Sequence, residues 1–78
     1  MNLEYRYEML TSSLEARIRE VTEYQVNIDN FVMAIELVGD DQELAEFRLQ
    51  LESMLQSSRL EQRKAQVMLD VIRKQVEL

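Results

Sequence analysis

Several residue types on which protein chemistry commonly depends are missing from this 78-residue sequence, which has no cysteine, histidine, tryptophan or proline and a single glycine. Without cysteine and histidine there is no disulfide scaffold, no Cys/His zinc site, no thiol nucleophile and no histidine base. One glycine cannot form a glycine-rich phosphate loop. The composition therefore predicts a protein that is not an enzyme and that uses no cofactor, metal or small-molecule substrate.

The charge balance and the short apolar runs restrict the partners and the compartment. Fifteen acidic residues against nine basic ones give a net charge of −6, which disfavours binding to nucleic acid or to an anionic membrane. No apolar run approaches the roughly 20 residues that cross a bilayer. The acidic N-terminus lacks the basic-then-apolar order of a secretory signal. We therefore expect a soluble, cytoplasmic protein that does not bind membranes.

Apolar residues make up 46% of the chain and charged residues 31%, as in a folded domain. The length allows a single domain, residues 1–78, near the lower limit for an independent core. Helix-forming residues dominate on both sides of Gly39. Gly39 suits the end of a helix, Asp40 can cap the next one, and Glu43 can complete a capping box. The sequence predicts an all-α antiparallel hairpin with helices at about 3–38 and 41–77 and a turn at 39–40.

Each predicted helix carries an apolar seam with the alternating three- and four-residue spacing of a coiled coil. The first seam contains Leu3, Tyr7, Leu10, Leu14, Arg17, Val21, Tyr24, Ile28, Phe31, Ile35 and Val38. The second contains Leu44, Phe47, Leu51, Leu55, Ser58, Gln62, Ala65, Leu69, Ile72 and Val76. Arg17 in the first seam and Ser58 and Gln62 in the second are polar.

A hairpin folded at residues 39–40 places opposite each other residues whose numbers add to about 79. Arg17 then lies opposite Gln62, and Ser58 lies opposite Val21, one layer away. This polar layer has two interpretations. A buried polar pair can fix the register of the two helices at some cost in stability. Alternatively, the guanidinium of Arg17 can recognise a carboxylate of a partner.

Both helices have a second apolar face, nearly opposite the seam. In the first helix this face contains Tyr5, Met9, Ala16, Val26, Met33 and Leu37, and in the second it contains Leu49, Leu60, Val67, Val71 and Leu78. Two helices alone bury only one face each, so we expect further helices from another molecule. The simplest source is a second copy, giving a homodimeric four-helix bundle or a higher helical oligomer.

The open end of the hairpin is expected to gather the richest part of this second face into one interaction surface. The predicted interaction residues are Tyr5, Met9, Ala16, Leu60, Val67, Val71 and Leu78. They predict a protein–protein interaction module with a structural, scaffolding or adaptor role, which binds itself or another helical protein.

A different protein partner is the alternative. In length, acidity and expected hairpin shape, the chain resembles the small acidic co-chaperones of bacterial type III secretion and small accessory proteins of bacteriophages. That resemblance is one of architecture, and it implies a hairpin that pairs with a different protein. A small nucleic-acid-associated regulator is a third possibility, for which salt-dependent retention on DNA would be the sign.

Overall fold

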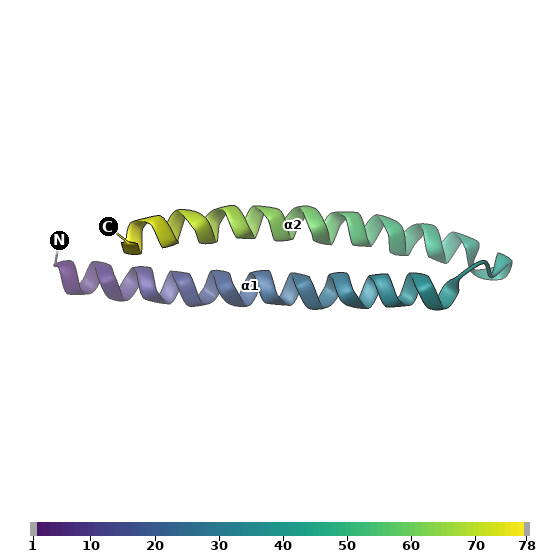
Figure 1. Cartoon of the computed structure of the whole chain (residues 1–78), viewed down its shortest axis with the longest axis horizontal. Helices are drawn as coiled ribbons and strands as arrows, with labels where there is room; N and C mark the ends of the chain where they lie inside the picture. Colours follow the sequence, from purple (N-terminus) through teal and green to yellow (C-terminus); the bar gives the residue numbers. More distant parts are fainter. Residues whose placement is uncertain (1, 78) are drawn as a thin grey trace.

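Two long helices joined by a turn make up the chain (Figure 1). The computed structural model describes residues 2–77. Helix α1 spans Leu3–Val38, the short 3-10 helix η1 spans Gln42–Leu44, and α2 spans Ala45–Glu77. No strand occurs between residues 2 and 77, so the predicted all-α helical hairpin is confirmed.

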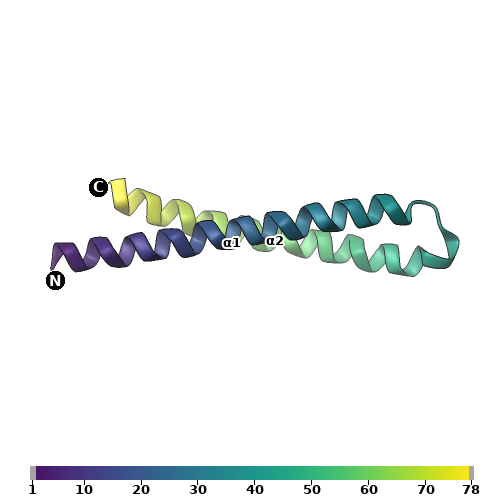
Figure 2. The same cartoon turned by 90° about the horizontal axis from the view of Figure 1, so that it is seen from below.

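The hairpin is a thin rod that measures 61 × 15 × 14 Å. The helices run antiparallel, so that the start of α1 and the end of α2 lie at the same end of the rod (Figure 1). Seen from the side, they cross at a shallow angle near the middle (Figure 2). This geometry suits two helices that keep a heptad seam in contact along their length.

Local sequence accounts for the start of α1. The Oδ1 atom of Asn2 accepts a hydrogen bond from the backbone N–H of Glu4 at 2.8 Å, which satisfies one of the free donors at the helix N-terminus. The carboxylate of Glu4 in the first turn also favours the positive end of the helix dipole. Because proline is absent, nothing interrupts the backbone hydrogen bonds before Gly39.

The core lies between the helices, along the predicted seams. Its buried side chains are Ile28 of α1 and Leu51, Leu55, Ala65, Leu69 and Ile72 of α2. The α1 seam residues from Leu10 to Val38 are buried or half-buried, whereas Leu3 and Tyr7 are exposed. One face of each helix is therefore covered, with an open stretch at the N-terminus of α1 and another at Leu44 and Phe47, beside the turn.

The register differs from the predicted one by about one helical turn. Residues that bond across the hairpin have numbers that add to 81 or more, not to about 79: Arg6 with Gln75, and Gln62 with both Val21 and Gln25. The reason is the turn, because α2 begins at Ala45 rather than at about residue 41. The start of α1 consequently extends beyond the end of α2 (Figure 1). Leu3 is 81% exposed, so it does not pair with Val76, as a sum of 79 would require.

Candidate interaction surface

The turn is built by Gly39 and Asp41. Gly39 has a φ of 54°, which residues with a Cβ rarely adopt, and its N–H donates to the carbonyl of Ile35 at 3.0 Å. The Oδ1 atom of Asp41 accepts from the backbone N–H of Glu43 at 2.9 Å and caps η1. The expected cap, Asp40, is exposed and does not fill that role, because η1 begins one residue later than predicted.

Arg48 is a structural residue that the sequence pattern did not identify. Its guanidinium donates from Nη1 to the carbonyl of Gly39, just past the end of α1, and pairs through Nε with Glu52 at 3.2 Å. A cation here offsets the negative end of the α1 dipole. Arg48 is half-buried, whereas Phe47, predicted in the seam, is exposed. The available signal was that Arg48 is the one cation among the acidic residues around the turn.

The predicted polar layer is only partly assembled. Gln62 crosses the hairpin, with its Nε2 atom 3.3 Å from the carbonyl oxygen of Val21 and 2.8 Å from Oε1 of Gln25. Arg17 instead pairs within its own helix with Glu20 at 2.8 Å. Ser58 is half-buried. Gln62 therefore bonds one turn away from Arg17, and the predicted direct opposition of these two residues is wrong.

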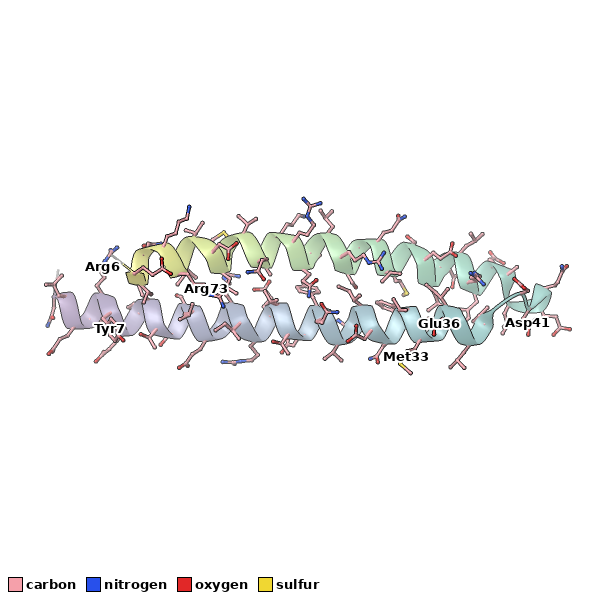
Figure 3. All side chains as sticks on the ribbon, viewed as in Figure 1. Arg6, Tyr7, Met33, Glu36, Asp41 and Arg73 are labelled. Carbon is pink, nitrogen blue, oxygen red and sulfur yellow. The ribbon has the colours of Figure 1, made fainter. Side chains whose placement is uncertain are left out.

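The outer face of each helix is the candidate surface. We define the outer face of α1 by the ten positions at alternating spacings of three and four that point away from α2: Tyr5, Met9, Ser12, Ala16, Arg19, Glu23, Val26, Asn30, Met33 and Leu37. All ten are exposed, with Met33 at 60% and Leu37 at 86%. Met33 projects from α1 on the side opposite α2 (Figure 3).

The outer face of α2 consists of Leu49, Leu60, Val67 and Val71. All four are exposed, Val67 at 60%. Leu78, which the sequence also assigned to this face, lies outside the described residues.

The two outer faces do not form the single patch that the sequence predicted at the open end. Tyr5 and Met9 lie on the far side of α1, and Val67 and Val71 lie on the far side of α2. Each pair is turned away from the seam of its own helix, so the two pairs look in opposite directions. A single contact with one partner can therefore cover the outer face of α1 or that of α2, but not both.

A shallow, open depression lies at the middle of the outer face of α1. It is lined by Arg19, Thr22, Glu23, Val26 and Asn27. Its walls place opposite charges beside an apolar side chain, an arrangement that suits protein contact better than enclosure of a small molecule.

Among residues 2–77, no three histidine, cysteine, aspartate or glutamate side chains gather as they would to hold a metal ion. No helix in that part of the chain combines the length and apolar character needed to span a bilayer. In comparisons with family models, curated proteins and solved structures, the chain matched none of them.

Proposed function

We propose that this chain is a non-enzymatic protein–protein interaction module with a structural, scaffolding or adaptor role, and that it acts by packing an outer helix face against another copy of itself. The observation that carries the proposal is the exposure of all the described apolar residues on both outer faces, while among residues 2–77 only six apolar side chains are buried. Exposed apolar side chains that gather on one face of a helix are candidates for an interaction site.

The shape of the hairpin supports the same conclusion. A rod 61 Å long and about 15 Å wide has little interior, and its single seam is two helices thick. In chains of about this length a single core supplies little stability, and oligomerisation, a metal or disulfides often add to it. Cysteine is absent, and the acids of residues 2–77 form no metal cluster, which leaves added helices as the source of stability.

Absolute mass by light scattering over a hundredfold concentration range, with helicity followed by circular dichroism, tests the proposal. A dimer or tetramer that melts cooperatively is the expected result. A cooperatively melting monomer would contradict it. A monomer with weak helicity would favour the alternative, a co-chaperone-like hairpin that folds only with a different protein.

A pair of substitutions makes the test specific to the outer face of α1. Met9→Glu with Met33→Glu should shift the wild-type oligomer toward monomer, because both side chains would carry charge into the contact. Gln50→Glu with Ser57→Glu adds the same charge at exposed positions of α2 that lie off its outer face, and should leave the mass unchanged. Equal behaviour of the two double variants would show that net charge, and not this face, controls association.

A further inference from the structure

The outer face of α1 has a pattern that reads alike in both directions. Positions at equal distances before and after Val21 can be compared in pairs. An apolar residue is paired with an apolar one, a neutral polar residue with another polar one, and the cation with the anion. The mirrored pairs, whose numbers all add to 42, are Tyr5 with Leu37, Met9 with Met33, Ser12 with Asn30, Ala16 with Val26, and Arg19 with Glu23. This is the condition for a surface that is complementary to itself under a two-fold axis.

From this pattern we infer that two copies associate through the outer faces of α1, antiparallel to each other, with the two-fold axis level with Val21. The inference rests on the proposed self-association and specifies its geometry. In antiparallel coiled coils, an a position of one chain packs in the same layer as a d position of the other. Every mirrored pair on this face combines one a and one d position. The two helices would contact each other over about 50 Å at 1.5 Å per residue.

Charge selects the antiparallel arrangement over the parallel one. In the antiparallel dimer, Arg19 of each copy lies opposite Glu23 of the other, beside the depression at the centre of this face. A parallel dimer would place Arg19 opposite Arg19 and Glu23 opposite Glu23. Neither side chain is needed for the hairpin itself, because both are exposed and on the side away from α2.

The distribution of charge along the rod acts in the same direction. Residues 21–60, the half that contains the turn, carry eight acidic and two basic side chains, whereas the rest of the chain carries seven of each. A parallel dimer would bring the two strongly acidic halves together. The antiparallel dimer places each acidic half beside a half of zero net charge, which reduces the repulsion.

The same geometry has a cost that makes the inference easier to test. A row of exposed acids, Glu8, Glu15, Asp29 and Glu36, runs beside the outer face of α1. The two-fold axis brings Glu8 near Glu36 of the second copy, and Glu15 near Asp29. Because these contacts and the net charge are repulsive, the dimer should become several-fold tighter as salt is raised from low to physiological concentration.

Charge exchange tests the central layer. In the dimer, Arg19→Glu places the new carboxylate of each copy opposite Glu23 of the other, so that two repulsive pairs replace two attractive ones. Dimerisation should weaken about tenfold. Adding Glu23→Arg restores opposite charges in the exchanged order and should recover the wild-type affinity. Failure of the second substitution to restore dimerisation would overturn the proposed layer.

Cysteine cross-linking tests the orientation, since the chain has no cysteine of its own. Met9→Cys and Met33→Cys, each alone, should remain uncross-linked under mild oxidation, and a disulfide-linked dimer should form when the two variants are mixed. A disulfide dimer from either variant alone indicates a parallel dimer and overturns the inference. No disulfide in any sample from a dimeric protein also overturns it, and leaves the proposed function standing. A wild-type chain that stays monomeric overturns both.

Discussion

The inner and outer faces of α1 have the same regular spacing and opposite surroundings. Both place residues at alternating intervals of three and four, but α2 covers only the inner one, so that Ile28 is 6% exposed and Val26, two residues earlier, is 53% exposed. The spacing alone thus indicates that a face can pack against a helix. It does not indicate whether the same molecule or another supplies that helix.

The outer face also differs from the inner one in its polar content. The inner seam of α1 is interrupted once, by Arg17, whereas the outer face has polar residues at four of its ten positions. Two helices of one chain are joined by the turn, so they meet at a high effective concentration. Two separate copies must also lose translational and rotational freedom when they associate. The more polar outer face is therefore suited to reversible association.

The largest effect should come from the inner seam. Leu69 is buried against α1, so Leu69→Ala should lower the free energy of unfolding by about 2–5 kcal/mol, measured by urea denaturation at fixed protein concentration. Val67→Ala, on the outer face of α2, is the matched control and should cost less than about 1 kcal/mol. Equal losses would mean that the outer face of α2 is as well covered in solution as the seam.

The turn decides which residues become inner ones, and Gly39 is its most constrained residue. Gly39→Ala should cost about 1–3 kcal/mol, since a φ of 54° with a ψ of −131° is unfavourable for alanine. The added Cβ would meet only the carbonyl oxygen of Glu36 at 3.7 Å, an ordinary contact, so the loss would measure backbone conformation alone. Thermal unfolding checks this, and an unchanged melting temperature would show that the turn can adopt another conformation.

The two neighbouring aspartates of the turn should differ. Asp41→Ala removes the cap of η1 and should cost about 1 kcal/mol, whereas Asp40→Ala should be close to neutral. Chemical denaturation of both variants makes the comparison. A larger loss for Asp40→Ala would show that Asp40 is the cap, as the sequence pattern predicted, and that the turn is shorter than in this structure.

The smallest effect is expected at the polar layer. Arg17→Leu together with Gln62→Leu should raise the melting temperature slightly, because two half-buried polar positions become apolar while the carbonyl of Val21 keeps its bond within α1. The same change should broaden the distribution of oligomers, since Gln62 bonds across the seam and penalises slipped registers. A lower melting temperature at unchanged mass would contradict both expectations.

Much of the inner seam could be predicted from the sequence. The residues that were predicted wrongly all failed for the same reason. The periodicity of α1 identified its seam from Leu10 to Val38, and Gly39 located its end. Leu3, Tyr7, Leu44 and Phe47 were placed in the seam and are exposed. They lie at the ends of the rod. Because α2 begins four residues later than predicted, the residues there do not have the partners that the predicted register gave them.

The apolar residues of the candidate surface were predicted, but its polar positions and its arrangement were not. All of its described members are exposed, as the second-face pattern implied, yet they divide between two sides of the rod. A helical wheel gives the direction of a side chain relative to its own helix. It does not give the direction relative to the other helix until the seam that joins them is known.

The sequence by itself determined that two helices form, where the first ends, and which face of each can pack, because these properties depend on helix propensity and on the periodicity of neighbouring residues. Only the tertiary structure decided the register, the choice of Asp41 as the cap, the role of Arg48 and the opposite directions of the outer faces. These features depend on how many residues the turn uses, because that number sets which residues of α2 lie opposite which residues of α1. The effect appears only when the two helices, which are far apart in sequence, are packed together.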